Sequence, residues 1–165
     1  MFELKPLSKE AIPKALERAD RYRLLNEPGE AESICMDVLA AEPENQRALV
    51  TLILALTDQF GQQRFNVGDN RCDEFIARLH DKYERVYYAG VVCERRAKAA
   101  YSHHQGGTMA YEWFRDAMGF YEEAEKLRPA GNDDAVLRWN TCARILQSNR
   151  DLQPAEEQGI EPYLE

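Results

Sequence analysis

Apolar side chains recur every three or four positions along most of this chain, which is the spacing of one face of an α-helix. Seven segments carry this spacing, and residues that favour turns separate them. The predicted helices span residues 9–25, 28–41, 46–60, 70–81, 83–104, 109–128 and 133–148. Runs of alternating apolar and polar residues, which would indicate strands, are absent from the sequence. The pattern therefore predicts an all-α protein.

Prolines and capping residues mark several of the predicted helix boundaries. Ser8 is a suitable N-cap for the first helix, and Pro28 suits the first position of the second, where its missing N–H costs nothing. Pro13 must lie near the first turn of its helix or cause a kink. The second helix should end at Glu42, because a residue that precedes proline avoids the α region. These signals support the helix boundaries independently of the apolar spacing.

One short pattern occurs twice in the chain. In each copy a small residue is followed at +4, +7 and +12 by a bulkier residue, a small apolar residue and a helix-stopping proline. The first copy is Ala31, Cys35, Val38 and Pro43, and the second is Ala117, Tyr121, Ala124 and Pro129. Each copy runs into a turn and a new apolar helix, as expected for consecutive helical hairpins.

On these residues the chain resembles the tetratricopeptide repeat family, in which a helix–turn–helix unit of 34 residues ends with a proline. Residues 12–45 match best, with Ala15 and Tyr22 at the packing positions of the first helix. Arg18 and Ala19 stand where the family usually has Leu-Gly. The two prolines are 86 residues apart, which is two repeats and 18 residues more, so the middle of the chain is irregular. The resemblance covers about two-thirds of the chain.

The resemblance implies a right-handed stack of about three antiparallel hairpins in residues 1–150, closed by a C-terminal capping helix. Trp139 and Leu146 are expected to pack on the apolar face of that helix and seal the stack. It also implies that first-helix faces line a concave groove for a peptide or a helix of a partner. Those faces offer Leu16, Asp20, Arg23, Arg47, Thr51, Leu54, Asp58, Glu84, Tyr87, Tyr88, Val91 and Arg95.

Composition narrows the classes of partner. The net charge of −8 argues against non-specific binding to nucleic acid or to anionic membranes, which needs a basic surface. No apolar run approaches the 18 residues that a membrane span needs, and the N-terminus resembles no signal peptide. The four cysteines are far apart and form no CxxC pair, so reduced, buried thiols are expected. A cytoplasmic protein that binds another protein or a peptide is the resulting expectation.

Three groups of residues are candidates for a site of chemistry. Adjacent histidines, His103 and His104, point about 100° apart on a helix and do not both face one metal ion. The acidic stretch 68–74 lacks the alternating ligands of a calcium loop. Cys93 lies beside two arginines, which can lower a thiol pKa, but it belongs to the apolar stripe and is expected to be buried and inert. We therefore expect no metal site, no cofactor and no catalytic residue.

The fifth predicted helix carries a local excess of positive charge. Its basic residues are Lys82, Arg85, Arg95, Arg96 and Lys98, against Glu84 and Glu94. A solvated face explains this excess, and a patch for an acidic peptide is the functional alternative. Gly90 and Ala97 on the same helix are small, which would let a neighbouring helix approach closely.

Two further classes of function stay open beside the interaction module. One is a structural role, as a homodimer or a subunit of an assembly. The other is an enzyme, which the sequence favours least because no spacing brings catalytic groups together. Residues 151–165 contain five acidic residues and no basic one, and they are expected to form a mobile tail. Ile160, Tyr163 and Leu164 in this tail have the apolar character needed to dock on a groove.

Overall fold

The computed structural model describes residues 1–62, 70–103 and 106–155, and these hold seven α-helices and one short 3-10 helix but no strand. The 3-10 helix, η1, spans Lys9–Ala11. The α-helices are α1 (Ile12–Leu24), α2 (Pro28–Ala41), α3 (Gln46–Asp58), α4 (Arg71–Ala77), α5 (Lys82–Ser102), α6 (Gly107–Leu127) and α7 (Asp134–Ser148). Over this part of the chain the all-α prediction is confirmed.

The predicted boundaries hold where a proline defines them. Pro28 is the first residue of α2, and Pro13 lies in the first turn of α1, where it removes no helical hydrogen bond. The start of the first predicted helix is instead the separate turn η1. Ser8 precedes that turn, but its side chain makes no capping hydrogen bond.

The fourth predicted helix is shorter than expected. It ends at Ala77 rather than residue 81, and Asp81 instead caps the next helix by accepting a hydrogen bond from the Tyr83 N–H at 2.9 Å. Similarly, α3 ends at Asp58 rather than residue 60. Most of the predicted loop at 61–69 lies outside the described residues. His104, where the fifth predicted helix ends, lies outside them as well.

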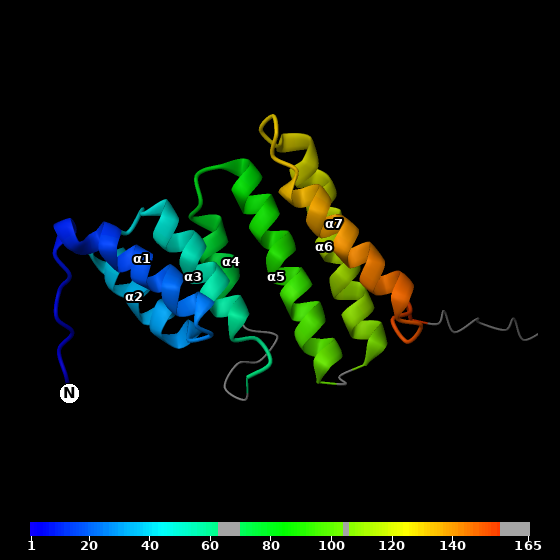
Figure 1. Ribbon diagram of the computed structural model, residues 1–165, viewed down its shortest axis with the longest axis horizontal. Coiled ribbons are helices and arrows are strands. Elements are labelled where there is room, and N and C mark those ends of the chain that lie inside the picture. Colours follow the sequence, from blue (N-terminus) through cyan, green and yellow to red (C-terminus); the bar gives the residue numbers. More distant parts are fainter. Residues whose placement is uncertain (63–69, 104–105, 156–165) are drawn as a thin grey trace, which may run out of the picture.

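Each helix packs against the next along the chain, from α1 and α2 at one end of the molecule to α6 and α7 at the other (Figure 1). Helices that are not consecutive also meet: α1 packs on α3, α3 packs on α5, and Arg138 of α7 bonds to Glu94 of α5. None of the described helices combines the length and apolar character needed to cross a membrane.

The buried side chains form two clusters. The N-terminal core lies within α1 to α4 and takes in Val92 of α5; it is dominated by aliphatic residues such as Leu49, Leu52 and Ile53. The C-terminal core lies within α5, α6 and α7 and includes Phe114 and Tyr121. Because α5 contributes to both clusters, it joins the two halves of the molecule.

Gly90 of α5 lets α6 approach closely, as its small size predicted. A Cβ at this position would lie 2.7 Å from a ring carbon of Tyr121, and 3.2 Å from the Cβ of Phe120. These distances are shorter than van der Waals contact, so no larger residue fits without moving Tyr121. The close approach gives α5 and α6 the most extensive packing of any helix pair among the described residues.

Trp139 and Leu146 of α7 pack against the C-terminal core as expected, but both are only partly buried. Trp139 donates a hydrogen bond from its indole N–H to Glu122 at 3.0 Å, so it packs at the margin of the core. No later helix covers the outer side of α7 among the described residues, and Leu137 on that helix is 62% exposed. The segment expected to be mobile begins with an ordered contact, since Leu152 is 2% exposed and belongs to the C-terminal core. Ile160, Tyr163 and Leu164 lie outside the described residues.

Candidate functional site

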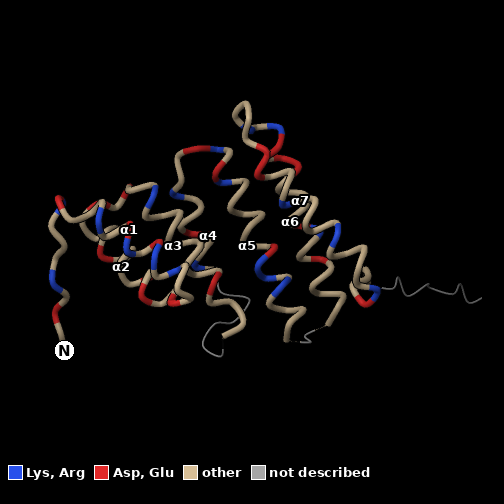
Figure 2. The backbone as a smooth tube through the Cα atoms, viewed as in Figure 1, with Lys and Arg blue, Asp and Glu red and all other residues tan. Residues whose placement is uncertain are grey.

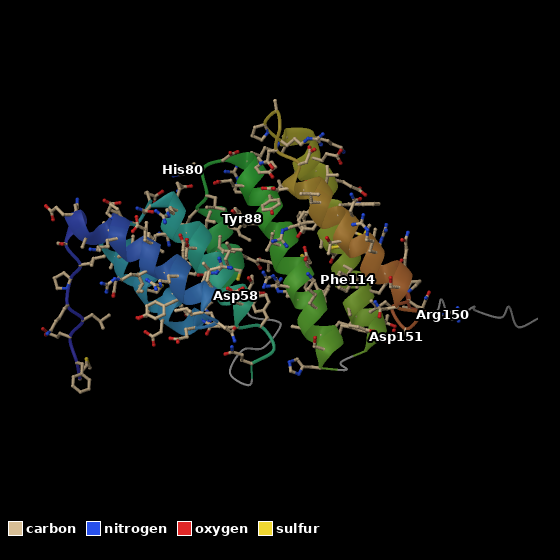
Figure 3. The ribbon with its side chains drawn as sticks, in the orientation of Figure 1. Asp58, His80, Tyr88, Phe114, Arg150 and Asp151 are labelled. Carbon is tan, nitrogen blue, oxygen red and sulfur yellow. The ribbon has the colours of Figure 1, made fainter. Side chains whose placement is uncertain are left out.

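Asp58, the last residue of α3, joins three helices through one carboxylate. It accepts hydrogen bonds from Arg23 Nε of α1 at 2.7 Å and from Arg95 Nη1 of α5 at 3.0 Å. Figure 3 shows Asp58 at the end of α3, where this helix faces α5. All three side chains are partly exposed. The contacts therefore form a charged strip across the surface that α1, α3 and α5 share.

A second carboxylate, that of Asp20 in α1, lies on the same surface. It contacts α3 at Thr51, about two helical turns before Asp58. Asp20 of α1 accepts hydrogen bonds from Arg47 Nη2 at 2.8 Å and from Thr51 Oγ1 at 3.2 Å. The Arg47 and Asp20 side chains are about half exposed, so their ion pair contributes less than about 1 kcal/mol to stability. This pair orients polar groups on the surface without holding the fold together.

Glu94 of α5 is the centre of a buried polar network. Only 1% of its side chain is exposed, and it accepts hydrogen bonds from Tyr121 Oη of α6 at 2.6 Å and from Arg138 Nη1 of α7 at 3.2 Å. Lys98, one helical turn further along α5, also forms an ion pair with it. Arg138 in addition donates to the Tyr87 hydroxyl at 2.9 Å.

The network keeps the Glu94 side chain ionised. Burial raises the pKa of this carboxyl, but hydrogen bonds from Lys98 and Tyr121 and the charges of Lys98 and Arg138 outweigh it, so the pKa lies below the ordinary value. Burial, followed by the charge of Glu94, raises the pKa of Tyr121, which therefore stays protonated and donates to the carboxylate. A buried negative charge on Glu94 thus lies beneath the partly exposed side chains of Lys98 and Arg138.

A cleft of about 430 Å³ opens between the end of α3 and the C-terminal half of α5. Its described lining has one carboxylate, that of Asp58, and three basic side chains, those of Arg95, Lys98 and Arg138. His103 at the end of α5 also lines it. Figure 2 shows basic positions gathered in the C-terminal half of α5. The cleft is therefore a basic site on a protein whose net charge is −8.

The structure brings together only part of the predicted groove. Asp20, Arg23, Arg47, Asp58 and Arg95 lie on the surface of α1, α3 and α5 in ion pairs that link these helices. By contrast, Glu84 lies in the first turn of α5, about 16 Å along the helix axis from Arg95.

The apolar members of the predicted groove belong mainly to the interior. Leu16 is 3% exposed and Val91 is fully buried, so neither offers a surface to a partner. Thr51 is also buried, and only its hydroxyl reaches the surface pair through Asp20. Leu54, Tyr87 and Tyr88 are partly buried and pack against the C-terminal core. These residues therefore belong to the core or its margin rather than to the open surface of a groove.

The predicted positive patch on α5 is divided in the structure. Arg85 turns back to the carbonyl groups of Leu79 and His80 at 2.7 and 2.9 Å, and Arg96 is buried with its guanidinium 5.1 Å from the Trp113 ring. Only Arg95 and Lys98 of the five basic residues line the cleft.

Sequence reasoning did not find Arg138 or Glu94 as parts of a site. The spacing of Glu94 and Lys98, four positions apart on a helix, was a usable signal for an ion pair. Arg138 had no such signal, because its partner Glu94 is 44 residues away.

Comparison of the chain with family models, with curated proteins and with solved structures gives no match. Among the described residues, no group of three or more His, Cys, Asp or Glu side chains is arranged to hold a metal ion. The candidate site is accordingly defined by its own geometry, a basic cleft beside a charged strip.

Proposed function

We propose that this protein is a non-catalytic interaction module that binds a segment of a partner protein across the surface of α1, α3 and α5. The observation that carries the proposal is the Arg23–Asp58–Arg95 contact, which continues into the basic cleft. Arginine is enriched among the residues that dominate binding at protein interfaces. Here its side chains are already oriented by Asp58, which lowers the entropy lost when a partner binds.

The order of helix contacts supports a stack of hairpins similar to tetratricopeptide repeats. In such a stack, the first helices of successive hairpins pack on one another as well as on their own partners. The contacts of α1 with α2 and α3, and of α3 with α4 and α5, have this order. In this proposal α7 is the capping helix, and the shared surface of α1, α3 and α5 is the concave groove.

A binding role without catalysis is supported by the state of the nucleophilic side chains. Burial raises the pKa of Cys35 and Cys142 to about 12 and that of Cys93 to about 11, so these thiols are not ionised near neutral pH. The free, buried thiols of Cys35, Cys93 and Cys142 also support the reducing, cytoplasmic location expected from the sequence.

The proposal is tested by affinity capture from a lysate of the source organism, followed by mass spectrometry. The test variant carries Arg47→Glu and Arg95→Glu, and its matched control carries Arg115→Glu and Lys126→Glu on the exposed side of α6. Both variants change the net charge equally. Partners of the wild type should be lost with the first variant, by about tenfold or more, and retained with the second. Equal capture by both variants would move the binding site away from α1, α3 and α5.

A structural homo-oligomer is the second candidate, and exposed apolar side chains favour it. Leu24 and Leu25 at the end of α1 are 88% and 59% exposed, and Leu137 on α7 is also largely exposed. Light scattering on the purified chain distinguishes the two candidates. The interaction module is expected to have the mass of a monomer, whereas the oligomer is expected to have a multiple of it.

A further inference from the structure

A groove of about 540 Å³ lies between residues 4–9 and α2, at the end of the molecule opposite to α6 and α7 (Figure 1). Leu7 packs against the N-terminal core and holds this N-terminal segment beside α2. The groove shares no lining residue with the basic cleft or the charged strip of the proposed function. Its apolar lining is formed by Leu4, Pro6, Leu7, Met36, Ala40 and Ala41.

The groove is open to water, although its walls are apolar. Leu4 and Met36, one on each wall, are 89% and 50% exposed, and removing such surface from water is favourable. Two lysines, Lys5 and Lys9, and one carboxylate, that of Asp37, complete the lining. No ion pair or side-chain hydrogen bond engages these three groups among the described residues. The groove therefore combines apolar walls with an excess of one positive charge, since two ammonium groups face one carboxylate.

We infer that this groove binds a medium-chain fatty acid, with the alkyl chain against the apolar walls and the carboxylate at Lys5 and Lys9. Pockets for small ligands have volumes of about 300–1,000 Å³ and apolar walls with a few polar groups. The groove meets both criteria. The two ammonium groups have donors for charge-assisted hydrogen bonds to a carboxylate, so they favour an anionic head group. The site is additional to the surface of α1, α3 and α5 and does not depend on the proposed function.

A helix of a partner protein fits this groove less well than an alkyl chain. The α2 wall of the groove runs from Met36 to Ala41, which is about 8 Å along the helix axis. A docked amphipathic helix uses anchors at i, i+3, i+4 and i+7, which spread over about 11 Å. The wall is therefore too short for such a row of anchors.

An extended segment of a partner also lacks a suitable template. Pro6 lies in the middle of residues 4–9 and has no N–H to donate, which interrupts the hydrogen bonds of a paired strand. An alkyl chain has no backbone polar groups to satisfy in the groove. An anionic membrane surface is disfavoured because the protein has a net charge of −8. A free fatty acid is thus the occupant that best matches both the walls and the charge.

The test is isothermal titration calorimetry of the full chain with decanoate as the probe. Saturation at a single site with a Kd on the order of 100 µM is expected for a ligand of this size. Decyltrimethylammonium has the same alkyl chain and the opposite charge, and it should bind at least about tenfold more weakly. Absence of saturable decanoate binding, or equal affinity for the two amphiphiles, would overturn the inference. Binding to vesicles of an anionic phospholipid without binding of free decanoate would overturn it as well.

A pair of charge variants locates the head group. Lys5→Gln with Lys9→Gln should weaken decanoate binding by about tenfold, as expected for lost charge-assisted hydrogen bonds. The matched control, Lys14→Gln with Lys126→Gln, removes the same charge at exposed positions outside the groove. It should change the Kd less than about twofold, because salt screens distant charges. An equal effect of the two variants would contradict the placement of the carboxylate at Lys5 and Lys9 and overturn the inference.

A variant that fills the groove locates the alkyl chain. Ala40→Trp places an indole in the groove and leaves the net charge unchanged, and Ala40 is exposed, so the fold should tolerate the larger side chain. Decanoate binding should fall at least about tenfold, because the alkyl chain and the indole would occupy the same volume. Gln147→Trp on the exposed side of α7 is the matched control and should keep the wild-type Kd. Thermal unfolding followed by circular dichroism verifies that all variants are folded, and a folded Ala40→Trp variant with unchanged affinity would overturn the inference.

Discussion

The N-terminal and C-terminal cores are built from helices with the same apolar spacing, but their interiors differ in chemistry. The N-terminal core is aliphatic, and its buried centre is formed by Leu49, Leu52 and Ile53. The C-terminal core is partly aromatic and encloses the ionised side chain of Glu94 with its partners Tyr121 and Arg138. Apolar burial alone accounts for the first core. In the second, a polar network also fixes how α5, α6 and α7 lie relative to one another, at a desolvation cost that apolar packing does not carry.

The largest effect is expected from emptying the aliphatic core. Leu52→Ala should lower the free energy of unfolding by about 2–5 kcal/mol, because the leucine is almost fully buried and its removal leaves a cavity. Urea unfolding followed by circular dichroism measures this change, which should be equal at pH 7 and at pH 4. A loss that depends on pH would mean that charged groups also contribute to the N-terminal core.

Glu94→Gln should have an effect that depends on pH. The folded chain has a lower Glu94 pKa than the unfolded chain, whose value is near 4.5, so the carboxylate stabilises the fold above that pH. This contribution is lost as the pH falls through the folded pKa. We expect a loss of about 2–4 kcal/mol at pH 7, below the full range for a broken buried pair because Lys98 and Arg138 are partly exposed.

Urea titrations of the wild type and the Glu94→Gln variant between pH 7 and pH 3 measure this difference. The two stabilities should converge at the acidic end. A constant difference across the range would show that shape, rather than charge, sets the contribution of Glu94.

Gly90→Ala tests the close contact between α5 and α6. The added methyl group lies within 2.7 Å of the Tyr121 ring, and overpacking of this kind costs about 1–3 kcal/mol. Because Tyr121 also donates to Glu94, the variant should lose part of the pH dependence seen in the wild type. Gly119→Ala on α6 is the matched control, since an added Cβ there meets nothing within 4 Å. It should be neutral or slightly stabilising in the same urea titration.

Trp139→Ala should have the smallest effect of the four, at about 1–2 kcal/mol. Full burial would have predicted 3–5 kcal/mol, but the indole is partly exposed and its N–H donates to Glu122, which is itself exposed. The shift of the melting temperature, followed by circular dichroism, measures the change. A loss of about 3–5 kcal/mol would mean that Trp139 is more deeply buried at the end of the stack than the exposure of α7 indicates.

The outline of the fold could be predicted because its signals are local. Pro28 and Pro13 define helix starts through their own geometry, and Gly90 indicates close packing through its size. The polar network could not be predicted, because Glu94 meets Tyr121 and Arg138 across separations of 27 and 44 residues. Periodicity within one helix carries no information about which polar residue of another helix will lie opposite.

For the candidate site, the sequence predicted the surface position of the charged residues but not the burial of the apolar ones. Arg23, Asp58 and Arg95 were assigned to one surface through the resemblance to tetratricopeptide repeats, and their ion pairs join α1, α3 and α5. Leu16 and Val91 were assigned to the same surface but are buried. An apolar residue at the edge of a helix stripe fits both a groove and a core, and only the position of the neighbouring helix distinguishes the two.

The contact between Gly107 and Asp151 has a consequence for how the molecule bears load. A Cβ at Gly107 would lie 2.0 Å from the Asp151 carbonyl oxygen, so the backbone after α7 presses directly on the first turn of α6. Leu152 beside it is held in the C-terminal core. A pulling force applied at the C-terminal end of the described chain would therefore reach α6 and Tyr101 of α5 before it could peel α7 away. The mechanical anchor of the described chain therefore lies just beyond the end of its last helix, at Asp151 and Leu152.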